Sequence, residues 1–512
     1  MTIAPERGAL IGRTTPRLST PPLVTGEPGP CGCGCALSPK TSLGFEAIDF
    51  AAKVLGIELL PWQRWWLIHA LELRGRRYRF RTILTLVARQ NGKTHLLKIL
   101  SLWAMYMGRA DLVLGAAQSL DIARESWQGA VDLAQGEPDL ADEIATVRYA
   151  NGEQCLTLKA TDDHGPARYR ITAATRSAGR GLSVDLLILD ELREHRTPHA
   201  WAALSKTTMA RPHALTVGIS NAGDAESVVL NQLRAAALAG ADEQLGIFEW
   251  SAPEGCPLDD PDAWAQAMPG LGITINEAAV RTSLATDPSV VFRTELLCQR
   301  VDALDAAVDP DAWRACGDPA ASIGALHRQM VMGVDVSMTS GHVTATAAVV
   351  AEDGRVIGEV FDQWTDVHAA RAGLRQAFEQ YRPRAVGWFP SGPMTVLRAE
   401  LEAAVTDGLI GEPDMIEPPE HAPGLVGLTG QDASSACQTL ASLVEGRRFI
   451  HADDPLLNAH IAASTRKDQG DGWRFARRGA GDNDAAYAMA GAVHLARTLP
   501  VPLDYDIAAS VF

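Results

Sequence analysis

Runs of apolar residues alternate with amphipathic stretches along residues 45–300 of this 512-residue chain. Four runs are short, apolar and rich in β-branched residues, and each predicts a buried strand: RTILTLV at 81–87, DLVLGAAQS at 111–119, VDLLILD at 184–190 and ALTVGISNAG at 214–223. Helical periodicity fills the intervals, as in FEAIDFAAKVLG at 45–56, and HLLKILSLWAMYM at 95–107 is apolar nearly all round. This alternation is typical of an α/β fold, with a parallel-rich sheet covered on both faces.

A different pattern begins near residue 325. The stretch MVMGVDVSMTSGHVTATAAVVAEDGRVIGEVFDQW at 330–364 contains a tight EDG turn and predicts an antiparallel meander of three strands. Further helices are expected at 371–381, 433–446, 455–464 and 484–499, and short strands at 384–389 and 473–478. We therefore expect a second α/β domain with a mixed sheet.

These patterns divide the chain into five parts. Residues 1–42 are rich in Pro, Gly, Thr and Ser, and we expect a flexible tail there. The first domain spans 43–302, and a linker rich in Ala, Asp and Pro spans 303–324. The second domain spans 325–500, and a C-terminal tail covers 501–512.

Composition narrows the class of protein. The chain is 46% hydrophobic and 21% charged, an ordinary globular mix that excludes uniform disorder. No apolar run reaches the roughly 20 residues of a membrane span, and no secretory signal opens the chain, so we expect a cytoplasmic protein. The net charge of -16 argues against nonspecific coating of nucleic acid, although it permits binding through a local strip of Arg.

Three of the eight cysteines, Cys31, Cys33 and Cys35, form the cluster PCGCGCA. Disulfide scaffolds are short and rich in Cys, which this chain is not. Three thiolates could hold a metal, but the spacing differs from the usual C-x2-C and no His follows nearby in the sequence. A flexible segment of small residues is the favoured interpretation.

The first candidate site is ARQNGKT at 88–94, between a predicted strand and a predicted helix. A phosphate-binding loop needs N–H groups around the anion, a helix N-terminus aimed at it, a Lys, and a Ser or Thr hydroxyl for Mg²⁺. Gly92, Lys93 and Thr94 meet this need, although Val87 stands where the generic motif has its first Gly. The surrounding strand and helix favour nucleotide binding over a helix that merely begins with GKT.

The second candidate site is the pair Asp190 and Glu191 at the end of the strand at 184–190. Open α/β sheets bind their ligands at the carboxyl ends of strands. Asp190 can hold Mg²⁺ through water, and Glu191 can polarise an attacking water. The alternative is a solvated strand end.

Taken in order, the motifs of residues 46–300 resemble those of bacteriophage terminase large subunits, most of all those of actinobacterial phages. RQNGKT at 89–94 resembles the family's variant Walker A motif, in which Arg89 replaces the Gly-rich start and touches the γ-phosphate side. LPWQ at 60–63 resembles its adenine-reading Q motif, and GRGLS at 179–183 resembles the stretch before its Walker B strand. VGISNAG at 217–223 resembles its coupling motif, which relays the state of the γ-phosphate.

The resemblance implies a P-loop ATPase domain that binds ATP and Mg²⁺. Its implied nucleotide contacts are Gln63, Arg89, Gln90, Asn91, Gly92, Lys93, Thr94, Asp190, Ser220 and Asn221. Thr94 and Asp190 would hold the metal, and Lys93, Arg89 and Glu191 would be catalytic. Arg124 or Arg180 could reach a neighbouring subunit's nucleotide, although an ordinary surface ion pair explains either equally well.

Carboxylates also stand out in the second domain. Asp335 lies on its first predicted strand, and Asp482 and Asp484 lie at the start of the closing helix. This layout is that of ribonuclease-H-like nucleases, whose carboxylates bind one or two Mg²⁺ or Mn²⁺ ions that activate water. Terminase large subunits carry this fold at their C-terminus, so Asp335 and Asp484 are the expected catalytic metal ligands, with Asp482 as the rival of Asp484. Helix capping is the alternative for either member of that pair.

One position departs from the family pattern. The family's second carboxylate usually ends the strand after the first helix, and here WFPSGP at 388–393 puts Phe389 at that position. Loss of a carboxylate weakens the binding of at least one ion. Glu359, Asp362 or Glu417 could substitute for it.

The implied function is that ATP hydrolysis drives translocation of viral double-stranded DNA into the procapsid, and that a metal-dependent endonuclease cuts concatemeric DNA. Two alternatives remain open: a packaging ATPase with an impaired nuclease, and a helicase-like DNA remodeller. The implied partners are double-stranded DNA, a portal protein, a small terminase subunit and further copies of the chain in a ring, as a pentamer. The implied location is the bacterial host cytoplasm, transiently at the procapsid portal, with no membrane and no place in the mature virion.

Two basic stretches could contact DNA. RGRRYRFR at 74–81 holds five Arg in eight residues, and a solvated connection is the favoured interpretation. Arg466, Lys467 and WRFARR at 473–478 flank the late carboxylates, where DNA contact and a surface hairpin are equally consistent with the sequence.

Overall fold

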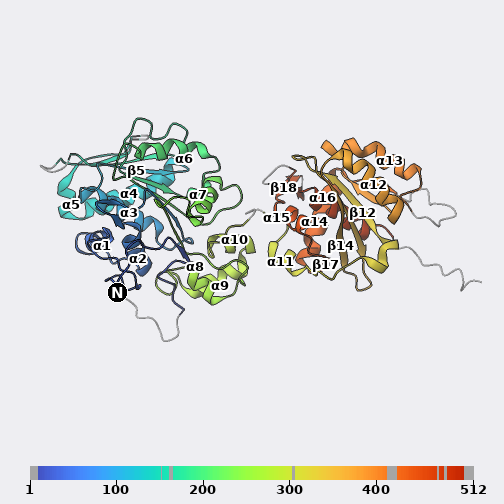
Figure 1. Ribbon diagram of the computed structural model, residues 1–512, viewed down its shortest axis with the longest axis horizontal. Helices are drawn as coiled ribbons and strands as arrows, with labels where there is room; N and C mark the ends of the chain where they lie inside the picture. The colour runs from blue at the N-terminus through green and yellow to red at the C-terminus, as the bar shows by residue number, and fades with distance from the viewer. Residues whose placement is uncertain are drawn as a thin grey trace, which may run out of the picture. The chain divides into compact units, whose positions relative to one another are not determined.

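The computed structural model describes residues 10–150, 153–160, 165–301, 306–411, 424–469, 472–477 and 481–500. The chain divides into two compact units, residues 1–301 and 302–512, each with its own sheet and core (Figure 1). The predicted C-terminal tail at 501–512 lies outside the described residues. None of the described helices is long and apolar enough to cross a lipid bilayer.

A nine-stranded sheet organises the first unit, in the order β1-β11-β4-β10-β9-β5-β8-β7-β6. The strands from β11 to β8 run parallel to one another, and β1, β7 and β6 pair antiparallel. The four predicted strands are confirmed as β4, β5, β9 and β10. The strands are β1 (Leu18–Ser19), β4 (Thr82–Leu86), β5 (Leu112–Ala117), β6 (Ile144–Arg148), β7 (Cys155–Leu158), β8 (Arg168–Ala173), β9 (Leu186–Asp190), β10 (Leu215–Ser220) and β11 (Leu245–Glu249), with a separate hairpin of β2 (Leu73–Arg74) and β3 (Arg77–Tyr78).

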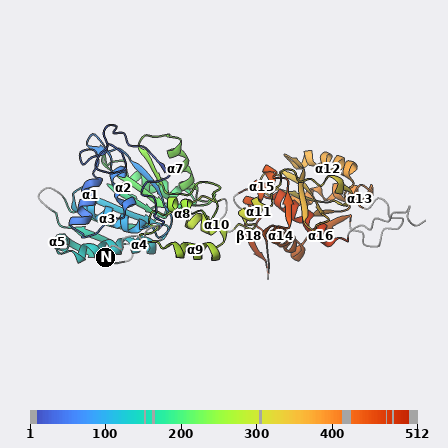
Figure 2. The ribbon, with the colours of Figure 1, turned by 90° about the horizontal axis from the view of Figure 1, so that it is seen from below.

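Helices cover both faces of this sheet because its central strands are apolar on both sides. Ile83 packs into the core on one face and its neighbour Leu84 into the core on the other. The first face carries α1 (Gly44–Lys53), α2 (Pro61–Ala70), α3 (Lys93–Tyr106), α4 (Leu120–Gly136) and α5 (Pro138–Glu143), which lie together in Figure 2. The second face carries α6 (Pro198–Ser205), α7 (Val228–Leu238), α8 (Pro261–Ala267), α9 (Glu277–Thr286) and α10 (Ser289–Glu295), with short 3₁₀ turns η1 (Leu192–Glu194) and η2 (Lys206–Thr208).

The flexible tail predicted for residues 1–42 is wrong for its described part, residues 10–42. β1 pairs with β11 at the edge of the sheet, and Leu37 is fully buried. Glu72 accepts the backbone N–H of Leu23 at 2.8 Å, so the segment is also held from the side. Composition alone missed these contacts because they join the segment to residues far along the chain.

The second unit contains a mixed six-stranded sheet in the order β16-β15-β12-β13-β14-β17. The predicted antiparallel meander is confirmed as β12, β13 and β14, and the other neighbours pair parallel. The strands are β12 (Val331–Val336), β13 (Val343–Val350), β14 (Val356–Trp364), β15 (Val386–Trp388), β16 (Leu425–Gly427) and β17 (Phe449–His451), with a separate hairpin of β18 (Arg466–Gln469) and β19 (Gly472–Phe475).

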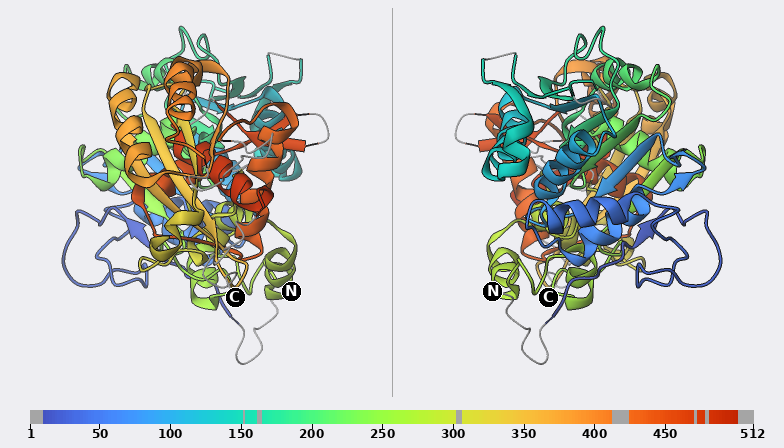
Figure 3. Two further views of the ribbon diagram at one scale, coloured as in Figure 1. Left: turned by 90° about the vertical axis from the view of Figure 1, so that its right-hand side faces the viewer. Right: turned by 90° about the vertical axis from the view of Figure 1, so that its left-hand side faces the viewer.

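Two helical layers enclose this sheet, and Figure 3 shows its gold strands between orange and red helices. One face carries α11 (Pro310–Ala315), α14 (Gly430–Glu445), α15 (Pro455–Ala462) and α16 (Asp484–Thr498). The other carries α12 (Val367–Tyr381) and α13 (Arg398–Thr406), with 3₁₀ turns η3 (Gly324–Gln329) and η4 (Gly392–Leu397).

The linker predicted at 303–324 belongs, where it is described, to the second unit. Ala307 and Val308 are buried, and Ala306 forms a β-bridge with Thr465. The Trp313 ring of α11 stacks on His451 with centroids 4.1 Å apart. These apolar contacts correct the expectation from composition, which recognised only the Ala, Asp and Pro content.

Candidate functional site

The loop between β4 and α3 is built as an anion cradle. Gly92 precedes α3 with a φ of +84°, a conformation that costs other residues strain, and it leaves the first N–H groups of α3 without intrahelical partners. A Cβ at Gly92 would lie 2.8 Å from the side-chain nitrogen of Gln63, so a larger residue would also displace the Gln63 amide from its place against this loop. A helix N-terminus of this kind attracts phosphate.

Buried side chains fix the shape of this loop by binding its carbonyl groups. Asn91 is fully buried, and its amide donates to the carbonyls of Ala88 at 3.1 Å and Arg89 at 2.9 Å. The Trp62 indole donates to the Asn91 carbonyl at 3.0 Å. The loop is therefore held in position by α2 and by its own Asn.

Both ends of the Gln63 side-chain amide form hydrogen bonds. Its oxygen accepts the Leu60 N–H at 2.9 Å, and its nitrogen donates to the Gly92 carbonyl at 3.0 Å. The expected adenine reader thus lies against the phosphate loop, where it joins the start of α2 to the start of α3.

Lys93, Asp190 and Glu191 meet at the carboxyl ends of β4 and β9. The Lys93 Nζ lies 3.6 Å from a Glu191 carboxylate oxygen and donates to the Val87 carbonyl at 3.3 Å. Burial and the Glu191 charge raise the pKa of Asp190 to about 6, against the opposing charge of Lys93. Glu191 itself has a φ of 50°, and such strained conformations gather at functional sites.

β10 lies between β4 and β9 and connects the two motifs. The Ser220 carbonyl accepts the Val87 N–H at 3.1 Å, and the Ser220 hydroxyl accepts the Arg193 N–H at 3.1 Å. The residues expected to contact nucleotide therefore converge at one edge of the sheet, where Gln90 and Arg89 are exposed and Thr94 is half-buried.

The sequence did not predict a further group of charged side chains at this site, which centres on Glu295. Glu295, at the end of α10, pairs with Arg89, binds Arg193 at 2.7 Å and accepts from the Asn221 amide at 3.1 Å. Arg193 is buried and also lies 3.2 Å from Glu191. No local signal marks Glu295, since 102 residues separate it from Arg193.

The two arginines expected to act between subunits lie on other segments, Arg124 on α4 and Arg180 between β8 and β9. Arg124 pairs with Asp121 at 3.2 Å on α4. Arg180 is exposed, in a hollow that it lines with Arg176, His199 and Lys206.

The carboxylate cluster of the second unit centres on Asp335, which is fully buried in β12. Arg477 donates to one Asp335 oxygen, and its guanidinium lies 3.7 Å over the Tyr487 ring. Burial raises the pKa of Asp335 to about 6 and the Asp484 charge adds to the rise, while Arg477 opposes it. The sequence left DNA contact and a surface hairpin equally open for the stretch that contains Arg477, and the structure places this side chain inside the cluster.

α16 brings Asp484 to the same place. Gly333 lies two residues before Asp335 on β12, and a Cβ there would lie 1.8 Å from the Ala488 carbonyl, so only Gly permits this close approach. Asp484, one turn before Ala488, is fully buried. One of its oxygens accepts from the Thr344 hydroxyl at 2.6 Å and contacts His342 Nδ1 at 2.8 Å.

Asp482 has a different environment from its rival. Its carboxylate accepts hydrogen bonds from the hydroxyls of Ser337, Thr339 and Ser340. Burial raises the pKa of Asp482, but these hydroxyls outweigh burial and hold it below its usual value. Asp482 thus fixes the loop after β12, and Asp484 is the deeper carboxylate.

Phe389 lies beside Asp335. β15 pairs in parallel with β12 through Val334 and Trp388, which puts Phe389 next in register to Asp335. Its ring packs against Tyr487 with centroids 4.9 Å apart. Of the possible substitutes, Glu359 accepts the Ile323 N–H, Asp362 is exposed, and Glu417 lies outside the described residues.

The remaining oxygens of the cluster fit a cation. Asp335 Oδ1 and Asp484 Oδ1 are buried and have no hydrogen-bond partner within the described parts of the chain. Buried carboxylate oxygens without donors are costly unless a cation or proton joins them. Oxygen ligands of this kind suit Mg²⁺ or Mn²⁺.

No family model matches the sequence, and no curated protein matches it. Solved structures do show similarity. The large terminase of bacteriophage HK97 is 19% identical with a TM-score of 0.44, over 88% of this chain and 99% of that one. The ATPase domain of the Thermus phage P74-26 large terminase is 15% identical with a TM-score of 0.34, over 49% of this chain and 97% of that one. The large terminase nuclease of phage G20c is 13% identical with a TM-score of 0.24, over 32% of this chain and 80% of that one. Bacteriophage large terminases are therefore among the solved structures that this chain resembles.

Proposed function

We propose that this chain is a terminase large subunit whose first unit hydrolyses ATP to move double-stranded viral DNA into a procapsid. The observation that carries the proposal is the convergence of Lys93, Asp190 and Glu191 at the carboxyl edge of one parallel sheet, beside a helix N-terminus. This edge combines a phosphate cradle with a carboxylate suited to activate water.

The residues at this edge divide the work of hydrolysis. Lys93 binds the β- and γ-phosphates, and Arg89 approaches the γ-phosphate side. Thr94 and Asp190 would hold Mg²⁺, which neutralises phosphate charge, and the raised pKa of Asp190 fits a buried carboxylate awaiting a cation. Glu191 orients and polarises the attacking water.

The ion pairs of the site suggest how nucleotide binding prepares catalysis. Glu191 is shared between Lys93 at 3.6 Å and Arg193 at 3.2 Å. A phosphate that takes Lys93 removes one of these partners and leaves the Glu191 carboxylate free to accept a hydrogen bond from water. Ser220 at the end of β10 is bonded to Arg193, and Asn221 just after β10 is bonded to Glu295, so both would sense the change.

Two substitutions test the ATPase proposal. Glu191→Gln keeps the shape but removes the base, so ATP binding should persist while turnover falls by about 10²-fold or more. Lys93→Ala should lose ATP binding itself. Lys53→Ala, on the exposed side of α1, is the control. Unchanged turnover in both Glu191→Gln and Lys93→Ala would refute the assignment.

We further propose that the second unit is a metal-dependent DNA endonuclease that cuts concatemers. Asp335 and Asp484 would hold Mg²⁺ or Mn²⁺ through the two buried oxygens that have no hydrogen-bond partner among the described residues, and the ion would activate water for attack on a phosphodiester. The Asp484 oxygen lies 3.4 Å from His460 Nδ1. Arg477 would have to release the Asp335 oxygen that it now binds. The exposed Arg466 and Lys467 of β18 are suited to contact DNA phosphates.

A packaging ATPase with an impaired nuclease is the second candidate, and Phe389 is the observation that favours it. An apolar ring in register with Asp335, together with the Arg477 ion pair, leaves fewer carboxylates than two metal ions need. Incubation with supercoiled plasmid and Mn²⁺ separates the candidates. Cleavage that Asp335→Asn abolishes supports an active nuclease; an inert chain that gains cleavage in Phe389→Asp supports the impaired one.

We also propose the partners of this chain: double-stranded DNA, a portal protein, a small terminase subunit and further copies of the chain in a pentameric ring. The proposal places the protein in the cytoplasm of a bacterial host and transiently at the procapsid portal. Sedimentation of the chain with ATP and DNA tests the ring, since a monomer under all conditions would contradict it.

A further inference from the structure

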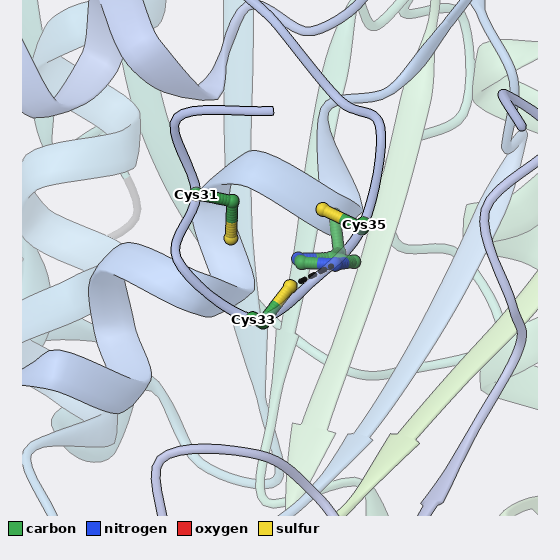
Figure 4. A group of neighbouring side chains, drawn as sticks. Cys31, Cys33 and Cys35 are labelled. Carbon is green, nitrogen blue, oxygen red and sulfur yellow. Dashed lines mark hydrogen bonds between the residues drawn. The ribbon is translucent and has the colours of Figure 1, made fainter. Parts of the chain in front are cut away.

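Three thiols and one imidazole meet outside both candidate sites. Cys31, Cys33 and Cys35 lie on the segment before α1, and His69 lies in the last turn of α2. Their ligand atoms all lie within 4.8 Å of one another. Figure 4 shows the three labelled thiols around an imidazole ring, which Cys33 contacts with its Sγ 3.6 Å from His69 Nε2.

The sequence turns all three thiols inward through its glycines. Gly32 and Gly34 alternate with the cysteines and have φ values of +80° and +89°. Side chains other than Gly rarely adopt this conformation, so the C-G-C-G-C pattern can curl and bring the thiols together, whereas an extended C-x-C-x-C strand would space them about 6.8 Å apart along one face. The Gly29 N–H donates to the Cys35 carbonyl at 2.7 Å and closes the loop.

His69 is oriented as a metal-binding histidine would be. Its Nδ1 lies 2.8 Å from the Trp65 carbonyl, and its ring stacks on the Trp65 indole with centroids 3.7 Å apart. A carbonyl can only accept, so Nδ1 carries the proton and Nε2 presents its lone pair to the thiols. Metal-ligating histidines are commonly fixed by such a bond from the other ring nitrogen.

We propose that Cys31, Cys33, Cys35 and His69 bind one Zn²⁺ ion as a closed structural site. With Zn–S bonds of about 2.3 Å and Zn–N bonds of about 2.1 Å, adjacent S and N ligands of a tetrahedral site lie about 3.6 Å apart. The Cys33–His69 pair already has that separation, and the other thiols need only a small contraction. Three Cys and one His complete the coordination, which leaves no open position for catalysis.

The position of the site indicates the role of the ion. It would fasten the segment before α1 to the last turn of α2. The first turn of α2 carries Trp62 and Gln63, which bind the phosphate loop through the carbonyls of Asn91 and Gly92. Zinc would therefore support the nucleotide cradle from the opposite end of one helix, without touching nucleotide.

The experiment measures metal content in the full chain purified without chelators. Inductively coupled plasma mass spectrometry should find about one zinc per chain, and Cys33→Ser should lose it. His69→Cys, which supplies a fourth thiolate, should retain it. Cys155→Ser, at a buried cysteine remote from the cluster, is the matched control and should keep full occupancy.

Cobalt gives a readout that does not depend on a variant folding. After zinc is removed under reducing conditions, added Co²⁺ should give the intense visible bands of a tetrahedral thiolate site, and zinc should abolish them. Chelation should also lower the melting temperature of the first unit. A reduced, folded chain that binds neither zinc nor cobalt would overturn the proposal. A disulfide among the three cysteines in the purified chain, or another metal in place of zinc, would overturn it as well.

Discussion

In the first unit, single side chains connect segments that are far apart in the sequence, and Glu295 is the clearest case. Its carboxylate joins Arg89 of the phosphate loop, Arg193 after β9 and Asn221 after β10. Since one side chain binds all three segments, a change at any of them reaches the others through it.

We predict that Glu295→Gln destabilises the chain by about 3 kcal/mol, because the buried Arg193 loses its main charged partner. ATP turnover should fall more than ATP binding, since Arg89 and Asn221 lose their common anchor. Urea unfolding and steady-state turnover measure the two effects. Glu194→Gln, which removes only a 3.5 Å contact to Arg193, should cost less than about 1 kcal/mol. Equal losses in the two variants would contradict this account.

His195 predicts a pH dependence. It is buried, neither of its ring nitrogens has a hydrogen-bond partner among the described residues, and burial lowers its pKa. A histidine with a lowered folded-state pKa takes up a proton more readily when unfolded. Its contribution is therefore intact above the unfolded pKa of about 6.5 and is lost as the pH falls through the folded value.

Replacing this ring with an apolar side chain should reduce the acid sensitivity. We expect His195→Leu to lose less melting temperature than the wild type between about pH 7 and pH 5. The exposed His199 on α6 supplies the control, and His199→Leu should keep the wild-type loss. Equal losses of melting temperature in wild type and His195→Leu across this pH range would exclude the effect.

Among the elements, the basic stretch that contains the β2–β3 hairpin has a structural role. Arg79, from the stretch RGRRYRFR, is buried and binds Glu72 at 2.6 Å and the Pro21 carbonyl at 2.7 Å. Arg81 donates to the carbonyls of Thr208 and Arg211. These two arginines are structural, so any phosphate contact from this stretch falls to the others.

We predict that Arg79→Leu costs about 3–5 kcal/mol, because it leaves the Glu72 carboxylate buried without its cation. The segment near Pro21 should also become more sensitive to proteolysis. Arg74→Leu, in an exposed pair with Glu243, should change stability by less than about 1 kcal/mol. Limited proteolysis and urea unfolding measure both, and identical digestion of Arg79→Leu and wild type would argue against the clamp.

The elements also show how far the sequence predicts this molecule. Long apolar runs such as those of β4, β9 and α16 can be recognised from the sequence alone, and so can the motifs that contain Lys93 and Glu191. β1 has two residues and exists only because it pairs with β11, more than 200 residues away. Arg477 and Asp335 are separated by 142 residues, and Cys33 and His69 by 36, so no local pattern could join them.

At the scale of the whole molecule, the chain divides into two compact units. Each has its own sheet and its own hydrophobic cores, and the division falls between Val301 and Asp302. The net charge of -16 says little about partners, because a net sum does not report where the exposed basic residues lie.

We predict that fragments 1–301 and 302–512 each fold alone, and that the full chain unfolds in two calorimetric transitions that match the separate fragments. ATP should raise only the transition of the first fragment, since the phosphate cradle lies wholly within it. A single cooperative transition in the full chain, absent from both fragments, would contradict this prediction.

The pairing of β1 with β11 has a practical consequence for handling this protein. The composition of residues 1–42 invites their removal, yet a chain that starts at Phe45 would uncover the outer edge of β11. Unpaired strand edges recruit strands from other chains. The shortened protein would be expected to self-associate and precipitate. A segment that looks dispensable therefore protects the edge of the sheet from pairing with other chains.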